Sequence, residues 1–331
     1  MTTSAAQFLL RRLGLYAVAA WASVTLNFFL PRLMPGDPAA ALVARFRGQL
    51  QPEAIAALRE SFGFTDQPLL IQYATYLFHL LKGDLGTSVS QFPASVGSVI
   101  ATGLFWTLLL AGVAVVISFV LGTLLGVLAA WRRGGLFDSL LSPALTFLGA
   151  FPYFWLAMVL LFVFGFGLGW FPRRHAYSDE LAPGFSVAFV GSVISHLLLP
   201  ATSIVLATLG GWMLGMRSTM IGVLADDYVT LAQAKGLPER RVMLRYAARN
   251  ALLPNVTGFG MAVGFVLSGS LLTEIVFSYP GTGYLLLQAV RSQDYPLMQG
   301  LFLTITFAVL GANLIVDLVY LWLDPRTRGR E

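Results

Sequence analysis

Residues 99–131 read VIATGLFWTLLLAGVAVVISFVLGTLLGVLAAW and contain no charged side chain. About 20 apolar residues are enough for a helix to cross the hydrocarbon core of a bilayer. The run is continuous, whereas a strand of a membrane barrel alternates apolar and polar residues. This stretch therefore predicts a membrane-spanning α-helix.

Further apolar runs on both sides of this stretch predict additional crossings. The expected spans are Phe8–Leu30, Val99–Trp131, Phe137–Leu168, Phe185–Met216, Val256–Phe277 and Met298–Leu323. Of the 331 residues 57% are hydrophobic and only 11% are charged, against about 25% charged in ordinary soluble domains. We therefore expect an all-α, polytopic membrane protein with about six transmembrane helices.

The first run, Phe8–Leu30, also has features of a signal peptide with a basic n-region. It is longer than a usual signal-peptide core, and Pro31, Arg32 and Leu33 do not form a small-residue cleavage pattern. We expect it to be kept as the first span.

Basic residues set the expected orientation, because Lys and Arg are enriched in the cytoplasmic loops of membrane proteins. More than half of the 21 Lys and Arg residues fall on the side of the N-terminus, so both termini are expected in the cytoplasm. The chain then divides into a cytoplasmic end with the first span at 1–30, an external cap segment at 31–98 and a membrane core at 99–331. The largest cytoplasmic loop of this core is 217–254.

The loop 217–254 carries the most informative pattern in the chain. Good helix formers run up to Lys235, Gly236 can end that helix in a left-handed turn, and Pro238 can open the next helix at its first position. The pattern predicts two short helices joined at a sharp corner. Two interpretations fit it equally: a rigid knob that docks in a groove of a partner protein, or a basic helix lying on anionic lipid headgroups.

The segment DYVTLAQAKGL at 227–237, followed by RNALLP at 249–254, resembles the EAA loop of ABC importer permeases. The version is that of the dipeptide, oligopeptide and nickel permease family. Similarity to this family extends over almost the whole chain, including MPGDP at 34–38 and EIVFSYPGTG at 274–283. The long segment after the first span resembles the B-type member of the permease pair.

This resemblance implies a type I ABC importer architecture, in which the loop is the coupling helix docked on a nucleotide-binding subunit. It further implies a homologous C-type permease, two ATP-binding subunits and an external solute-binding protein as partners. The location would be the bacterial inner membrane, in contact with membrane lipid, and the substrate a di- or oligopeptide imported by alternating access. The residues expected to couple to the ATPase are Asp227, Ala232, Ala234, Lys235, Gly236, Leu237, Glu239, Arg240 and Arg241.

ATP hydrolysis itself is not expected in this chain. A phosphate-binding loop needs a Gly-rich turn followed by Lys and then Ser or Thr, but the two lysines, Lys82 and Lys235, are each followed by Gly. We therefore expect no enzyme activity and no cofactor here, with ATP and Mg²⁺ bound by partner subunits. The chain has no Cys and three scattered His residues, so no metal site is expected, and its short basic blocks do not indicate nucleic acid.

Two carboxylates fall in or near the expected spans, where charge is costly and often functional. Glu274 is a candidate gate or pathway residue, or else bonds backbone groups of the turn at 280–281. Asp317 could relay charge, but we expect it to pair structurally with an Arg or with an amide such as Asn313.

Phe151, Pro152 and Tyr153 are further pathway candidates. They form either a wall for the substrate at a kink or part of an interfacial aromatic belt. Gly122 and Gly126 form a small-xxx-small pair suited to close helix contact.

Two alternatives remain open for the function. One is a stand-alone ion-coupled secondary transporter, which needs intramembrane carboxylates that the sequence supplies sparingly. The other is a permease of the same family for nickel or another small solute.

Overall fold

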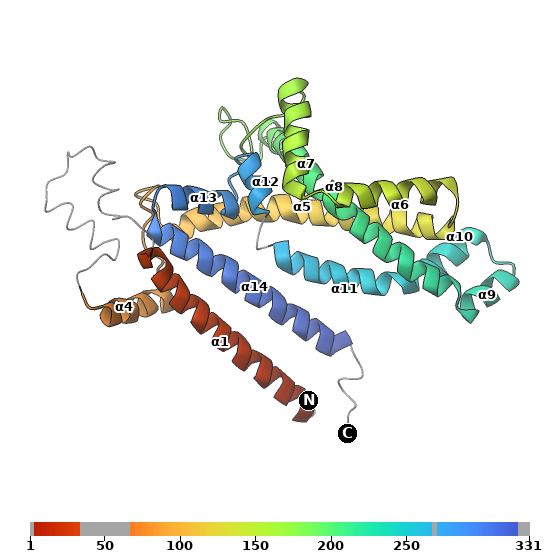
Figure 1. Cartoon of the computed structure of the whole chain (residues 1–331), viewed down its shortest axis with the longest axis horizontal. Helices are drawn as coiled ribbons and strands as arrows, with labels where there is room; N and C mark the ends of the chain where they lie inside the picture. Colours follow the sequence, from red (N-terminus) through yellow and green to blue (C-terminus); the bar gives the residue numbers. More distant parts are fainter. Residues whose placement is uncertain (1–2, 34–66, 267–269, 324–331) are drawn as a thin grey trace. The chain divides into compact units, whose positions relative to one another are not determined.

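The computed structural model describes residues 3–33, 67–266 and 270–323. Every regular element in these ranges is a helix, as Figure 1 shows, and an isolated bridge pairs Thr87 with Ser95. The helices are α1 (Thr3–Leu33), α4 (Leu69–Leu81), α5 (Val96–Trp131), α6 (Leu136–Gly149), α7 (Tyr153–Leu160), η1 (Leu161–Gly167), α8 (Val187–Leu224), α9 (Asp227–Ala234), α10 (Glu239–Arg241), η2 (Val242–Ala248), α11 (Arg249–Val266), α12 (Leu271–Val276), α13 (Thr282–Arg291) and α14 (Tyr295–Leu323).

The prediction of an all-α membrane protein is confirmed, because the described elements are helices and several of them are long and apolar. Within the described residues α5, α8 and residues 295–315 of α14 are long and apolar enough to cross a bilayer, and α6 with α7 and η1 makes a fourth crossing if that bent pair is one span. The helices α1 and α11, expected to supply the other two crossings, are not among them. Of the expected cap segment 31–98, residues 34–66 lie outside the described residues.

Two expected spans need correction. The span expected at 137–168 is broken, because α6 and the α7–η1 helix meet at 96°. Pro152 lacks an N–H group and disfavours helical backbone at the residue before it, which ends α6. The expected loop 217–254 includes the end of α8, which continues to Leu224, and the start of α11, which begins at Arg249. The span expected at 256–277 is divided between α11 and α12.

The chain packs into two compact units, one of residues 1–106, 267–269 and 281–331 and the other of residues 107–266 and 270–280. This division follows packing, whereas the predicted division at residues 30 and 98 follows membrane topology.

In the first unit, α1 packs along α14. The Asn27 amide donates to the Gln299 carbonyl oxygen at 2.8 Å. Near the other end, Asp317 accepts a hydrogen bond from the Tyr16 hydroxyl at 2.6 Å and forms an ion pair with Arg12 at 3.3 Å. The prediction that Asp317 pairs structurally with an Arg is therefore confirmed.

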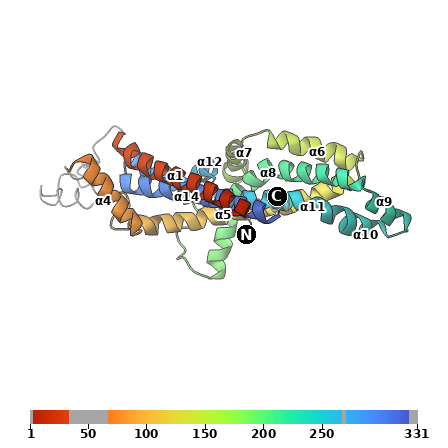
Figure 2. The same cartoon turned by 90° about the horizontal axis from the view of Figure 1, so that it is seen from below.

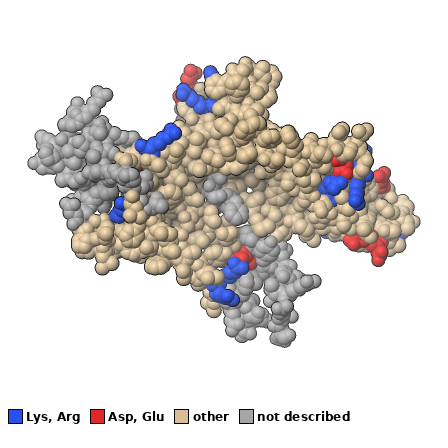
Figure 3. All heavy atoms as spheres, viewed as in Figure 1, with Lys and Arg blue, Asp and Glu red and all other residues tan. Residues whose placement is uncertain are grey.

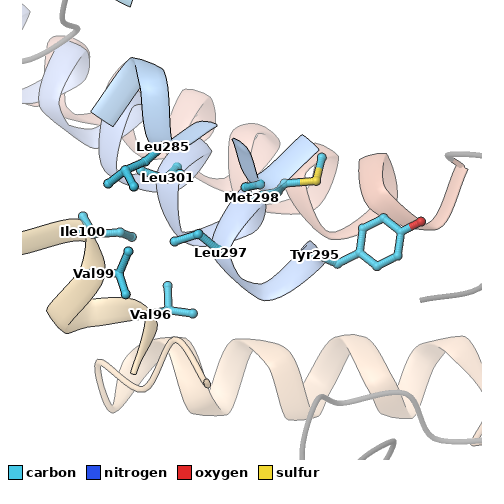
Figure 4. Close-up of a cluster of buried hydrophobic side chains, with 9 residues drawn as sticks. Val96, Val99, Ile100, Leu285, Tyr295, Leu297, Met298 and Leu301 are labelled. Atoms are coloured by element: carbon cyan, nitrogen blue, oxygen red, sulfur yellow. The ribbon is translucent and has the colours of Figure 1, made fainter. Parts of the chain in front are cut away.

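A buried apolar cluster joins three helices of the same unit. Val96, Val99 and Ile100 of α5 meet Leu285 of α13 and Leu297, Met298 and Leu301 of α14, together with Ala289 and Tyr295 (Figure 4). Just before α14, the buried Asp294 accepts from the Ser88 and Ser90 hydroxyls at 2.5 and 2.7 Å and caps α14 through the Leu297 N–H. The helix ends of this unit are thus fixed by packing and by one buried carboxylate.

In the second unit, α8 is the central helix and packs against α6, α7 and α11. The predicted close contact at Gly122 and Gly126 is present. A Cβ on Gly126 would lie 2.5 Å from the Met213 carbonyl oxygen, and one on Gly122 would lie 2.5 Å from the Trp212 Cβ. The two glycines therefore let α5 lie directly against the backbone of α8.

Candidate functional site

Residues 225–248 form a compact bent segment, which we call the elbow. It consists of α9, a corner at Lys235–Pro238, α10 and η2. Figures 1 and 2 show α9 and α10 beyond the ends of α6 and α8 in the second unit. The predicted pair of short helices at a sharp corner is present.

Gly236 makes the corner possible. Its φ is +70°, in the left-handed region that suits glycine. The Gly236 N–H donates to the Gln233 carbonyl oxygen at 2.9 Å, and the Leu237 N–H donates to the Ala232 carbonyl oxygen at 3.4 Å. This pair of bonds is a Schellman motif, which satisfies carbonyl groups left over at the end of α9. The predicted left-handed turn is confirmed.

Pro238 begins the second arm of the elbow differently from the prediction. Its ψ of 134° is extended, so Pro238 is the N-cap of α10 and Glu239 is the first helical residue. The Pro238 carbonyl oxygen accepts the N–H groups of Arg241 and Val242 at 2.8 and 3.1 Å. Pro238 therefore lies just before α10, and its carbonyl oxygen accepts the first hydrogen bonds of the helix.

The elbow has its own apolar core. Val229, Ala232 and Val242 are buried together, and the partly buried residues packed on them are Trp131, Val223, Leu224, Leu237 and Tyr246. Ala232 is only 3% exposed and packs with Val242 of η2. The expectation that Ala232 lets a partner approach closely does not match this inward placement. Its small size instead brings the two arms of the elbow together.

Two side-chain hydrogen bonds fix the elbow further. The Trp131 indole N–H, at the end of α5, donates to the Glu239 carboxylate at 2.6 Å. The Asn250 amide, in α11, donates to the Tyr228 hydroxyl at 2.9 Å. Both arms are thus tied to long helices outside the elbow. Trp131 was not among the sequence candidates, because nothing in its local pattern shows a partner 108 positions away.

The outward face of the elbow carries both basic and acidic side chains, with apolar side chains among them. Exposed coupling candidates are Asp227, Ala234, Lys235, Gly236, Glu239, Arg240 and Arg241, whereas Leu237 is half-buried. Leu231 is 55% exposed and Tyr228 is 38% exposed, although neither was a sequence candidate. Figure 3 shows charged side chains gathered at this end of the second unit. The sequence signal that could have identified Leu231 is a large apolar residue in the short, mostly polar segment that forms α9.

The elbow is continuous with the long helices. The helix η2 runs into α11 without a break, and Ala247, Ala248 and Ala251 pack against Val127 and Ala130 of α5 and against Met216 and Met220 of α8. Small alanines on one side and flexible methionines on the other give close packing. The elbow is therefore packed directly on α5 and α8 and continuous with α11.

The pathway candidates lie elsewhere in the second unit. Glu274 is fully buried in α12, and its Oε1 accepts a hydrogen bond from the buried Thr107 hydroxyl at 2.9 Å. The Glu274 carbonyl oxygen also accepts the Tyr279 N–H at 2.8 Å. The structure thus places the Glu274 side chain inside the unit, against α5, and shows the turn bonded to its backbone.

The aromatic candidates mark the bend between α6 and α7. The Phe151 ring stacks on Trp155 at 4.7 Å, Pro152 is the N-cap of α7, and Tyr153 is its first residue. The helix α12 packs against both α7 and α8. The bend and the buried carboxylate therefore belong to neighbouring helices.

Two family models cover nearly the whole sequence. Residues 5–119 match the N-terminal model of binding-protein-dependent transport system membrane components. Residues 122–329 match the model of the binding-protein-dependent transport system inner membrane component. The chain belongs to this family of transport permeases.

Curated relatives of this permease match over almost their full length. The di/tripeptide transport system permease protein DppB of Pseudomonas aeruginosa is 36% identical, with 98% of this chain and 99% of that protein covered. The dipeptide transport system permease protein DppB of Escherichia coli is 35% identical, with 98% and 99% covered. The oligopeptide transport system permease protein AppB of Bacillus subtilis is 33% identical, with 91% and 92% covered.

These relatives confirm the predicted family and its B-type member. The permease is accordingly a multi-pass membrane component of an ABC transport complex.

Proposed function

We propose that this permease is the B-type membrane subunit of an ATP-driven importer of peptides, and that the elbow receives the force of ATP hydrolysis from a partner ATPase. Relatives named for dipeptide, di/tripeptide and oligopeptide transport support the substrate class. The observation that carries the coupling role is the rigid corner at Gly236, which presents exposed Leu231 and basic residues and continues into α8 and α11.

The geometry suits force transfer because the elbow has little internal freedom. Its arms share a buried core, its corner is closed by two backbone hydrogen bonds, and Trp131 holds the second arm. An ATPase surface that moves α9 would therefore move the whole elbow. Leu231 and Tyr228 supply apolar contact, and Arg240 and Arg241 suit carboxylate groups on the partner.

The remaining assignments of the proposal follow from this role. Both termini and the elbow face the cytoplasm, a C-type permease completes the pathway, and a solute-binding protein delivers peptide from outside. ATP and Mg²⁺ bind to the two ATPase subunits, and this chain catalyses no reaction by itself. Lipid covers the apolar faces of the long helices.

Crosslinking tests the docking role directly, and the native chain contains no Cys. A Lys235→Cys variant in the assembled complex is expected to crosslink to an ATPase subunit through a short bifunctional reagent. Thr75→Cys, exposed on α4 and expected on the external side, is the matched control and should give no such product. An intact complex in which position 235 reaches only lipid reagents, or no ATPase, overturns the proposal.

Two carboxylates among the described residues are held in ion pairs with arginine, which does not favour ion-coupled transport. Asp138 pairs with Arg217 at 2.6 Å and Asp317 pairs with Arg12 at 3.3 Å. Carboxylates held in this way are poorly suited to bind and release a coupling ion in each cycle.

A further inference from the structure

A two-pronged ion pair joins α6 to α8 in the second unit, before α8 reaches the elbow. Arg217 of α8 donates from Nε to Asp138 Oδ1 at 2.6 Å and from its terminal nitrogen to Asp138 Oδ2 at 2.7 Å. Asp138 lies in the first turn of α6 and is only 4% exposed. Paired parallel bonds of this kind fix orientation as well as distance, because the guanidinium group and the carboxylate are both planar.

The same carboxylate also gathers two other groups. The Gly134 N–H donates to Oδ2 at 3.1 Å, and the Ser142 hydroxyl donates to Oδ1 at 2.9 Å. Gly134, with φ of +78°, belongs to the tight turn that joins α5 to α6. Asp138 therefore holds the turn, the start of α6 and α8 at a single point.

A second contact between α6 and α8 lies further along the two helices. A Cβ on Gly210 of α8 would lie 2.6 Å from the Leu145 carbonyl oxygen of α6. The two helices thus touch through backbone at this point and through the ion pair near Arg217. Two separated contacts prevent one helix from pivoting on the other.

The ion pair joins the helix that leads to the elbow with the helix that leads to the α6–α7 bend. Arg217 lies in the part of α8 that runs on to Leu224 and the elbow, and α6 leads in the other direction to the bend at Phe151 and Pro152. A buried ion pair gains little stability over apolar packing, whereas breaking one by removing a partner is costly. We therefore assign this pair the role of fixing the orientation of α6 relative to α8, and not that of adding stability.

We propose that Asp138 and Arg217 are positioning residues that make the elbow, the end of α8 and α6 one rigid body, so that motion of the elbow swings the α6–α7 bend. This inference rests on the coupling role proposed above for the elbow. The pair touches neither substrate nor nucleotide. The pair determines that motion of the elbow is passed through α8 to α6.

Distance measurement between two spin labels tests the rigid body. Ser139→Cys on α6 and Gln233→Cys on α9 are both exposed positions, and the chain has no other Cys to label. In the complete transporter the distance between the labels is expected to change by less than about 2 Å between the nucleotide-free and ATP-bound states. A change of about 5 Å or more, on the order of one helical turn, overturns the inference.

Asp138→Asn and Arg217→Lys test the pair itself. Each is expected to broaden the distribution of label distances and to lower peptide uptake per ATP hydrolysed about fivefold, with ATPase activity retained. Asp317→Asn is the matched control, because it removes a carboxylate from the ion pair with Arg12 in the other unit and should leave the label distances narrow. If Asp138→Asn prevents assembly, Arg217→Lys decides, since it keeps the charge and loses the two-pronged geometry.

Narrow label distances and normal uptake per ATP in an assembled Arg217→Lys complex overturn the positioning role. The coupling role is tested separately by the crosslink from position 235. A crosslink to the ATPase together with labels that move apart rejects only the rigid body, whereas loss of the crosslink rejects the coupling role.

Discussion

The Trp131 indole N–H donates a 2.6 Å hydrogen bond to the Glu239 carboxylate, which joins the last residue of α5 to the first residue of α10. Bonds to an ionised acceptor are about twice as strong as bonds between neutral groups. The second arm of the elbow is therefore held by α5, although the chain enters the elbow from α8 and not from α5.

Replacing Glu239 tests this link. Glu239→Ala removes the acceptor and is expected to reduce uptake per ATP about threefold, with the free energy of unfolding reduced by only about 1 kcal/mol because the site is exposed. Glu239→Gln keeps an oxygen that can accept the indole N–H and should fall between Ala and the wild type. Uptake and ATP hydrolysis measured together in proteoliposomes give the ratio. Equal ratios for Ala and the wild type would remove the link from the coupling path.

Substitution of Gly236 separates backbone conformation from contact with a partner. A Cβ at this position meets no atom within 4 Å, so the first side-chain atom has open space. The φ of +70° is the obstacle, costing about 1–2 kcal/mol for ordinary side chains and less for Asn.

We therefore expect Gly236→Val to uncouple ATP hydrolysis from uptake and Gly236→Asn to retain most coupling if backbone conformation is the only requirement. The measurement is again uptake per ATP, with chain yield in the membrane as the control for insertion. A complex carrying Gly236→Val that transports as well as the wild type would show that the corner is not needed. Equal failure of the two variants would show that the partner packs against the bare backbone.

The corner at Gly236 could be predicted from the sequence because its causes are local. Glycine after a helical run followed closely by proline defines where one helix ends and another begins. Hydropathy likewise predicted most of the long helices, since apolar length is a property of a single segment. Pro152 indicated a kink, but hydropathy could not show that this kink is a 96° bend, because composition indicates that a segment is apolar and carries no information on its direction.

The partners of the charged residues could not be predicted, since they come from distant parts of the chain. Asp138 and Arg217 are 79 positions apart, and Tyr16 and Asp317 are 301 apart. Ala232 is a different case. Val229 and Ala232 are three positions apart on one helix and both are buried, so helical periodicity could have predicted that Ala232 faces inward.

The contact between α5 and α8 gives a prediction about stability. Gly126→Ala places a Cβ 2.5 Å from the Met213 carbonyl oxygen and is expected to lower the free energy of unfolding by about 1–3 kcal/mol, because backbone must move. Gly112→Ala is the matched control on the same helix, since a Cβ there meets no atom within 4 Å. Thermal unfolding in detergent should separate the two, and equal midpoints would contradict the close packing.

The buried carboxylate of Glu274 gives the last prediction, which concerns the candidate gate. Glu274→Gln has nearly the same volume, and its amide oxygen can still accept the hydrogen bond from Thr107. A residue needed only for packing should tolerate this change. A residue whose charge is needed as the pathway opens and closes should not.

We expect Glu274→Gln to assemble with normal thermal stability and to lower uptake about tenfold while the ATPase remains active. Thr273→Val is the matched control, because the Thr273 hydroxyl is buried on the same helix and makes no hydrogen bond among the described residues. Its removal takes away a polar group without changing charge, so uptake should stay close to that of the wild type. If Glu274→Gln transports as well as Thr273→Val, the charge of Glu274 has no part in the gate and its bond to Thr107 serves packing alone.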